Sequence, residues 1–238
     1  MTTRVLIPCA GNHERWDMKM PKHLVPICKE PILERQVRLI KEHDPKADVR
    51  IVVPDLTDDQ YKITGTKRAK AKLDPERGEV DKVASSKHLW NKTGDTIISW
   101  GDVWYEREVL DSVLDYDTEN GWQFWGTFLG DGGELFAFKF GPDDHATMAE
   151  AIDTVAAAHA AGEMKVPAPQ HASGSRGVPG GWGLYRALNN RKMNDHKNDG
   201  RVTLVNGWTD DFDAKTDWDR WCLRYAKATP AERERRLE

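Results

Sequence analysis

The stretch Val5–Gln36 reads VLIPCAGNHERWDMKMPKHLVPICKEPILERQ and indicates how this chain folds. It opens with a short apolar run, typical of a buried strand, which ends at Gly11. A polar loop follows, and from Pro31 onward apolar residues recur at helical spacing, with the proline in the first turn. A buried strand, a loop and an amphipathic helix in this order predict the first unit of an α/β fold.

The rest of the chain continues this alternation of strands and helices. We expect strands over 48–54, 95–100 and 201–205, helices over 106–114, 143–161 and 216–227, a short helix over 83–91, and an antiparallel hairpin formed by 121–129 and 134–140. Residues 57–82 are expected to be helix and loop, and the Pro-, Gly- and Ser-rich residues 165–181 a long loop. The pattern predicts a mostly parallel sheet with helices on both faces, plus a small antiparallel hairpin.

Composition limits the possible classes of protein. The 238 residues, 39% of them hydrophobic, suit one globular domain, expected over 1–228, with a charged helical tail over 229–238. A net charge of −4 argues against broad, charge-driven binding of nucleic acid. The apolar N-terminal run is too short for a signal peptide or a membrane span, so we expect a cytoplasmic protein with no membrane partner. Three distant cysteines imply no disulfide framework, and the ten tryptophans are expected mostly in the core.

The loop after the first strand has the composition of a phosphate-binding loop. Gly11 allows a close approach of the backbone to a ligand, and Arg15 and Lys22 can neutralise phosphate charge. Backbone amides in such a turn can cradle phosphate oxygens. The predicted nucleotide-binding residues are Ala10, Gly11, Asn12 and His13 in this loop, and Gly101 further along the chain. The alternative is an ordinary strand–loop connection with solvated basic residues.

Two groups of carboxylates also follow predicted strands. Asp102 comes after the strand that ends in Trp100-Gly101, and Asp211 and Asp213 come shortly after the last strand. Ligands of open α/β sheets bind at the carboxyl ends of the strands, where carboxylates can hold a hard divalent cation. The alternatives are an aspartate in a turn or at a helix start, and a solvated acidic loop.

Several further residues are weaker candidates. If the chain binds a nucleotide, Ser85 and Ser86 are candidates for contacts to its base or ribose, although they also suit the start of a helix. Around the long loop, Arg176 and Arg186 could meet a substrate phosphate, and Trp182 or Tyr185 could stack on a sugar, or these aromatic residues could belong to the core. The histidines, His13, His23, His88 and His171, are expected at the surface, and no hydrolase motif accompanies them.

The opening motif resembles that of the sugar-phosphate nucleotidyltransferases. The residues in register are Gly11, Arg15, Pro21, Lys22, Leu24, Pro26, Pro31, Ile32, Leu33 and Glu34. Asp102 matches the metal-binding aspartate of that family's Gly-Asp motif, and the segment 211–217 resembles the segment that supplies its second metal carboxylate. The resemblance implies the nucleotide-diphospho-sugar transferase (GT-A-like) fold. One departure is His13, which stands where the family has a second glycine.

The resemblance implies transfer of a nucleotide from a nucleoside triphosphate to a sugar phosphate or similar phosphorylated small molecule, with release of pyrophosphate. Arg15 and Lys22 are then the catalytic residues, and Asp102 with Asp211 or Asp213 holds Mg²⁺ or Mn²⁺. The atypical loop and the many tryptophans favour an alternative, a GT-A-fold glycosyltransferase with a nucleotide-sugar donor; only there do we expect nucleic acid, as a possible acceptor. A third possibility is a non-catalytic nucleotide-binding module. A homo-oligomer fits each of them.

Overall fold

A seven-stranded sheet forms the centre of the protein. The computed structural model describes residues 2–10, 16, 18–72, 83–127, 133–164, 181–193, 195 and 200–237. In order across the sheet the strands are β10 (Val202–Leu204), β8 (Gln123–Gly126), β9 (Leu135–Phe140), β6 (Thr96–Ser99), β1 (Arg4–Pro8), β4 (Asp48–Val53) and β5 (Lys67–Lys70). Strand β9 runs antiparallel to both of its neighbours, and the other strand pairs are parallel. The predicted fold class, including the antiparallel hairpin of β8 and β9, is confirmed.

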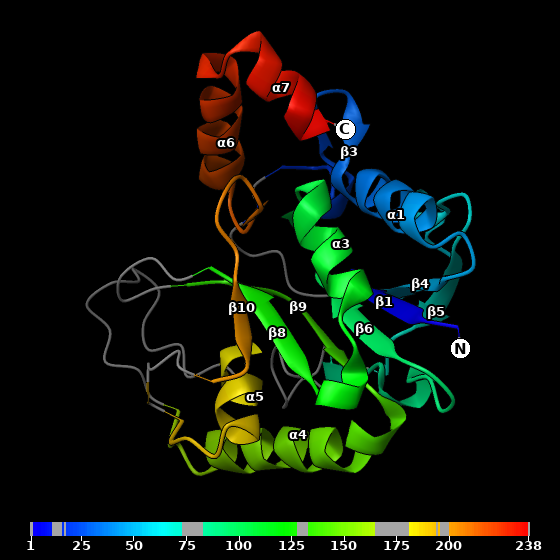
Figure 1. Ribbon diagram of the computed structural model, residues 1–238, viewed down its shortest axis with the longest axis vertical. Helices are drawn as coiled ribbons and strands as arrows, with labels where there is room; N and C mark the ends of the chain where they lie inside the picture. Colours follow the sequence, from blue (N-terminus) through cyan, green and yellow to red (C-terminus); the bar gives the residue numbers. More distant parts are fainter. Residues whose placement is uncertain are drawn as a thin grey trace.

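Helices cover both faces of this sheet (Figure 1). Helices α1 (Ile32–His43) and α3 (Arg107–Asp115) lie on one face, and α4 (His145–Ala160) and α5 (Gly181–Leu188) lie on the other. Alternate residues of the strands point to opposite faces, so Val5 and Ile7 pack against α1 and α3 while Leu6 packs on the side of α4 and α5. Both faces of the central strands are therefore buried, as their continuous apolar runs predict.

A third hydrophobic cluster lies beyond the sheet and consists largely of tryptophans. Its members are Trp16, Val25, Ile27, Ile32, Trp104, Trp208, Phe212 and Trp221. It joins helix α6 (Lys215–Lys227) to two short ladders, β2 (Pro26–Ile27) with β3 (Glu30–Pro31), and β7 (Val103–Trp104) with β11 (Asp210–Asp211). Helix α7 (Pro230–Leu237) follows α6, and both lie at one end of the molecule (Figure 1).

Two predicted elements differ from the structure. Residues 57–82 were expected to be helix and loop, but their described part contains the edge strand β5 and a 3-10 turn at Asp59–Tyr61. The sequence of β5, KRAK, lacks the β-branched and aromatic residues that mark strands; pairing with β4 and packing of Ala69 and Ala71 against the core override that propensity. In place of one continuous short helix over 83–91, residues 83–84 are α-helical and the 3-10 turn Lys87–Leu89 follows. Within the described residues, no helix combines the length and apolar character that crossing a membrane requires.

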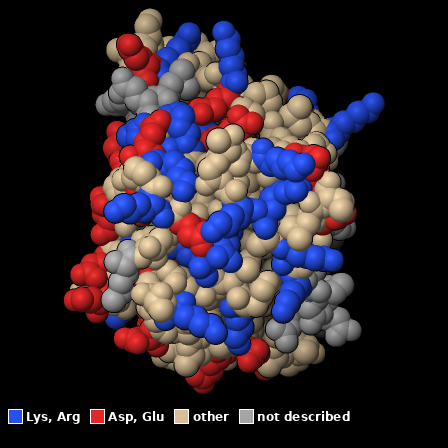
Figure 2. Space-filling model, turned by 90° about the vertical axis from the view of Figure 1, so that its right-hand side faces the viewer, with Lys and Arg blue, Asp and Glu red and all other residues tan. Residues whose placement is uncertain are grey.

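Basic side chains gather on the side of the molecule where α1, β4 and β5 lie (Figure 2). Three basic residues of neighbouring strands meet at Asp48, the first residue of β4. Its carboxylate accepts hydrogen bonds from Arg4 (2.8 Å), Arg50 (2.8 Å) and Lys67 (3.2 Å). Burial alone would raise the pKa of Asp48, but these three cations outweigh it and hold the pKa well below its usual range.

This depressed pKa predicts how acid acts on the protein. The ionised Asp48 stabilises the fold above the pKa of about 3.9 that it has in the unfolded chain, and this contribution is lost as the pH falls through the lower folded-state pKa. We expect Asp48→Asn to lower the free energy of unfolding at pH 7. The deficit against the wild type should shrink steadily below pH 4, and urea unfolding at several pH values measures it. A deficit that grows with acidification would contradict this assignment.

Candidate functional site

The candidate site lies where β1 and β6 end side by side. These two parallel strands pair over Arg4–Leu6 and Thr96–Ile98. From β1 the chain crosses through α1 to β4 on one side of β1, whereas β6 lies on its other side. Such a change of direction opens a crevice at the carboxyl ends of the strands, which is where open α/β sheets bind ligands. Residues 9–10 and 100–102 follow these ends.

A short antiparallel ladder brings the two predicted carboxylate groups together. In this ladder Asp211 of β11 pairs with Val103 of β7, and Asp210 with Trp104. The backbone N–H of Phe212 donates to the carbonyl oxygen of Asp102 at 3.0 Å. Residues more than one hundred positions apart in sequence are thereby held beside one another, and Phe212, fully buried in the tryptophan-rich cluster, anchors the arrangement.

Lys22 connects the two carboxylate groups. It lies in the 3-10 turn Lys22–Leu24, and its ammonium forms ion pairs with Asp102 and, at 3.0 Å, with Asp213. The side chains of Lys22 and Asp102 are each only 7% exposed, and that of Asp213 is 29% exposed. A buried charge without a partner of opposite sign is strongly destabilising. Here the Lys22 ammonium is the partner of two carboxylates.

The charges of the site shift the protonation of its members. Burial alone would lower the pKa of Lys22, but the attraction of Asp102 and Asp213 outweighs it and raises the pKa, so the ammonium is charged at neutral pH. Burial raises the pKa of Asp211 well above its usual range, and the nearby carboxylates of Glu134, Asp213 and Asp102 raise it further. The carboxylates around Asp211 repel one another, and a cation bound among them would relieve this repulsion.

A residue that the sequence analysis did not identify supports this arrangement. Glu106 is buried, and its carboxylate accepts a hydrogen bond from the backbone N–H of Trp208 at 2.9 Å. Its own backbone N–H donates to the hydroxyl of Thr209, also at 2.9 Å. Glu106 thus fixes the segment that leads into Asp210–Asp211. In the sequence it has the position of a helix-starting residue, and nothing there indicates that it is buried.

Close packing places Gly101 and Asp102. A Cβ atom at Gly101 would lie 2.7 Å from the sulfur of Cys9, 3.1 Å from the ring of His23 and 3.2 Å from Ile7. His23 is only 3% exposed and contacts the hydroxyl of Tyr61 at 3.4 Å. The prediction that His23 lies at the surface is therefore wrong; it follows Lys22 in a turn whose opposite side faces the core, a placement that no local pattern indicates.

We expect Gly101→Ala to disturb both folding and activity. The added methyl group cannot be accommodated without moving Cys9 or the backbone that carries Asp102. Overpacking of this kind costs about 1–3 kcal/mol of unfolding free energy. Gly181→Ala is a suitable control, because its Cβ would make only ordinary contacts at 3.5 Å and beyond. Urea unfolding of both variants tests this, and equal stability of the two would contradict the packing argument.

The other predicted residues fall into four groups, the last of which lies on helix α5. Ala10 lies directly beside the site and is buried. Ser85 and Ser86 are also buried, and the hydroxyl of Ser86 donates to the carbonyl oxygen of Val83, as expected of residues in a turn. The predicted residues Gly11, Asn12, His13, Arg15 and Arg176 lie outside the described part of the chain.

The weaker candidates on helix α5 pack against the protein. Trp182 donates through its indole N–H to the carbonyl oxygen of Gly133 at 2.8 Å. Tyr185 is fully buried in the core, so it cannot stack on a sugar. The guanidinium of Arg186 donates to the carbonyl oxygens of Asp195 (2.6 Å) and Met193 (2.9 Å) and holds that segment in place.

The carboxylates of the site are candidate ligands for a divalent cation. Among the described residues, no group of three or more His, Cys, Asp or Glu side chains is arranged to hold a metal ion. Asp102 and Asp213 nevertheless meet at one cationic atom, the Lys22 ammonium. Their oxygen donors suit Mg²⁺, which uses one or two carboxylates and takes its remaining ligands from water and phosphate. The residues present therefore fit a cation that binds together with a phosphorylated substrate.

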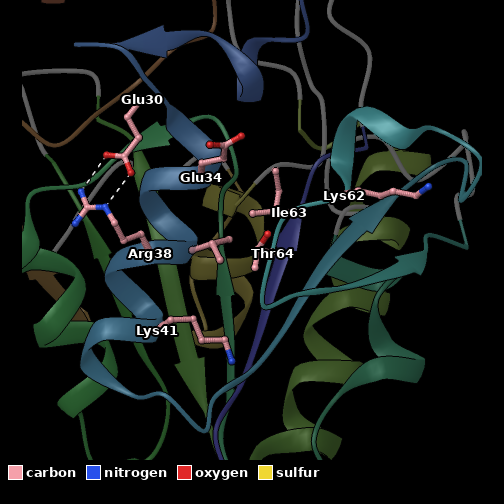
Figure 3. A pocket seen from close by; sticks show the side chains of 8 residues that line it. Glu30, Glu34, Arg38, Lys41, Lys62, Ile63 and Thr64 are labelled. Atoms are coloured by element: carbon pink, nitrogen blue, oxygen red, sulfur yellow. Dashed lines mark hydrogen bonds and ion pairs between the residues drawn. The ribbon is translucent and has the colours of Figure 1, made fainter.

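A separate hollow of about 350 Å³ lies between α1 and the segment 62–64 (Figure 3). It is lined by Glu30, Glu34, Val37, Arg38, Lys41, Lys62, Ile63 and Thr64. The guanidinium of Arg38 forms two hydrogen bonds with Glu30, at 2.8 and 2.9 Å, so the main charges of this hollow are already matched. It contains none of the predicted site residues.

Comparisons with known proteins identify the fold. No family model and no curated protein matches the chain. Among solved structures it is similar to UDP-glucose pyrophosphorylase from Acinetobacter baumanii (12% identity, 98% of this chain and 96% of that chain, TM-score 0.59). It is also similar to CTP:phosphocholine cytidylyltransferase from Streptococcus pneumoniae (14%, 94% and 99%, 0.55) and to CMP:2-keto-3-deoxy-manno-octonic acid synthetase (10%, 95% and 99%, 0.58). The chain therefore has the fold of these enzymes along nearly its whole length, which confirms the fold that the resemblance implies.

Proposed function

We propose that this protein is a metal-dependent nucleotidyltransferase. It joins a nucleoside triphosphate to a sugar phosphate or a similar phosphorylated small molecule and releases pyrophosphate. The observation that carries the proposal is the convergence of Lys22, Asp102 and Asp213 beside the carboxyl ends of β1 and β6. The names of the structural neighbours support it, since they include a UDP-glucose pyrophosphorylase and a CTP:phosphocholine cytidylyltransferase.

The proposed reaction is a displacement at the α-phosphorus of the triphosphate. A phosphate oxygen of the second substrate forms a bond to this phosphorus, and the bond to the bridging oxygen of the leaving pyrophosphate breaks. Such a reaction depends on positioning and on neutralising charge, and it needs no covalent intermediate. Lys22, charged and largely buried, supplies positive charge for the phosphates, and we propose that Arg15 supplies more.

Mg²⁺ or Mn²⁺, when bound, neutralises the phosphate charge and orients the reacting groups. Asp102 would hold the cation together with Asp213 or Asp211; Asp102 directly precedes β7, Asp211 belongs to β11, and Asp213 follows it. The rigid placement of Asp102 by the Phe212 backbone and by the packing of Gly101 keeps one ligand fixed. We place the reaction in the cytoplasm, as expected of an enzyme that consumes nucleoside triphosphates.

A pyrophosphate-release screen tests the proposal. The purified protein is incubated with Mg²⁺, each common nucleoside triphosphate, and a panel of sugar 1-phosphates and other phosphorylated small molecules. We expect pyrophosphate only when one particular triphosphate and one particular acceptor are both present, and we expect EDTA to abolish its release. Absence of release for every pair would contradict nucleotidyl transfer.

The same screen separates the competing functions. A glycosyltransferase would leave the triphosphates intact and would instead hydrolyse or transfer the sugar of a nucleotide-sugar. A non-catalytic module would bind a nucleotide, as seen by calorimetry, and turn over neither kind of substrate. The three functions thus predict three different sets of products.

A further inference from the structure

The ammonium of Lys22 occupies the position at which the carboxylates of the site converge. It contacts both Asp102 and Asp213. These are the carboxylates to which the proposed function assigns the divalent cation, and Lys22 is the residue to which it assigns the phosphates. Lys22 cannot bind the substrate phosphates while its ammonium is held between the two aspartates.

The charges show that the ammonium and a divalent cation exclude one another. Asp102, Asp213 and Lys22 together carry a net charge of −1, so the ammonium already offsets half of the charge of these two carboxylates. A divalent cation added beside the ammonium would repel it strongly, because the side chains of Lys22 and Asp102 are largely shielded from water. Entry of the metal therefore requires that the ammonium leave.

The distances support the same conclusion. The ammonium holds the oxygen of Asp213 at 3.0 Å, whereas Mg²⁺ draws its oxygen ligands to about 2.0–2.1 Å. The carboxylates must consequently move closer when the metal replaces the ammonium. Asp102 is fixed by its neighbours, and Asp213, which is 29% exposed and follows the short strand β11, is the partner that can move.

The side chain of Lys22 is suited to leaving. An ammonium on a flexible four-carbon stem can change partners, unlike a planar guanidinium fixed by two parallel hydrogen bonds. The turn that carries it lies next to the crevice at the ends of β1 and β6.

We propose that Lys22 acts as an internal substitute for the metal ion and that it exchanges with it. Without substrate, its ammonium holds Asp102 and Asp213 together. Binding of the metal with the triphosphate releases the ammonium, which then moves to the phosphates. This proposal rests on the proposed function. The exchange makes metal binding weak until phosphates are present to receive Lys22.

The binding of Mn²⁺ alone, without any nucleotide, tests the exchange. Free Mn²⁺ is measured by electron paramagnetic resonance during titration of the wild type, Lys22→Gln, Lys22→Arg and Lys46→Met. Lys22→Gln removes the competing charge but can still donate a hydrogen bond to a carboxylate. We expect it to bind Mn²⁺ at least tenfold more tightly than the wild type. Lys22→Arg keeps the charge and should bind no more tightly than the wild type.

Lys46→Met controls for the general effect of removing one positive charge. Lys46 is exposed, and its side chain contributes nothing to the carboxylate cluster, so we expect a change of less than twofold. Equal Mn²⁺ affinity of the wild type and Lys22→Gln would overturn the proposal. If Lys22→Gln is unfolded without metal, recovery of its near-ultraviolet circular dichroism on adding Mn²⁺ supports the exchange, and failure to recover overturns it.

The outcome is independent of the pyrophosphate screen. Tighter Mn²⁺ binding by Lys22→Gln in a protein that releases no pyrophosphate would support the exchange and refute the proposed function. Pyrophosphate release by the wild type, with no gain of Mn²⁺ affinity in Lys22→Gln, would do the reverse.

Discussion

Replacing Asp102 by asparagine is expected to lower kcat/KM for pyrophosphate release by about 10²–10³-fold, the usual effect of removing one well-placed charge-stabilising group. Asp102 is buried, its backbone carbonyl oxygen accepts a hydrogen bond from the Phe212 N–H, and its carboxylate is paired with Lys22. Asparagine has the same shape but lacks the negative charge that a divalent cation requires. The ammonium of Lys22 would keep Asp213 as a partner, so we expect the variant to fold.

Asp115→Asn is the matched control for this prediction. It makes the same chemical change on α3, where the side chain is 70% exposed, and we expect its activity to stay within twofold of the wild type. Steady-state kinetics with the substrates from the screen, together with a melting curve for each variant, measure both effects. A folded Asp102→Asn protein with near-normal kcat/KM would exclude Asp102 from the site.

The second large effect is the loss of stability expected when Trp221 in α6 is replaced by alanine. This residue is 2% exposed, and its ring lies 4.8 Å from that of Trp104 and 5.5 Å from that of Trp208. Its indole N–H donates to the carbonyl oxygen of Trp208 at 3.1 Å. We expect Trp221→Ala to lower the free energy of unfolding by about 3–5 kcal/mol, as large-to-small substitutions of buried aromatic residues do.

The Trp221→Ala substitution should also disturb the candidate site. The tryptophan-rich cluster includes Phe212, which lies between Asp211 and Asp213 in the sequence. Leu223→Ala is the control on the same helix: Leu223 is 56% exposed, so its truncation should change stability by less than about 0.5 kcal/mol. Urea unfolding of the two variants provides the comparison. Similar stabilities would mean that α6 does not depend on this cluster.

The sequence predicts the first half of the sheet well because its signals are local. The apolar run of β1 and the apolar stripe of α1 each mark one element. Strand β5 escapes detection because its residues are basic or small and its stability comes from the neighbouring β4. The tryptophan-rich cluster is equally hidden, since Trp16, Trp104 and Trp221 come from distant segments and no periodicity connects them.

The site is predicted only in part, because contacts between distant segments leave no local pattern in the sequence. The rule that ligands bind at strand ends identifies Asp102 and leads to Asp211 and Asp213, and the structure brings Asp102 and Asp213 together. Their meeting depends on the two-residue β7–β11 ladder, which is too short to leave a pattern in the sequence. The contact of Lys22 with both carboxylates and the burial of Glu106 follow from this ladder and were not predicted.

The fate of a radioactive α-phosphate tests the central claim most directly. The triphosphate identified by the screen, labelled with ³²P at the α-position, is incubated with its acceptor, Mg²⁺ and the wild-type protein. The account predicts that the label appears in a nucleotide diphosphate-linked product that requires the acceptor, while pyrophosphate stays unlabelled. Label found only in unreacted triphosphate, or only in free nucleoside monophosphate whether or not acceptor is present, would contradict nucleotidyl transfer at this site.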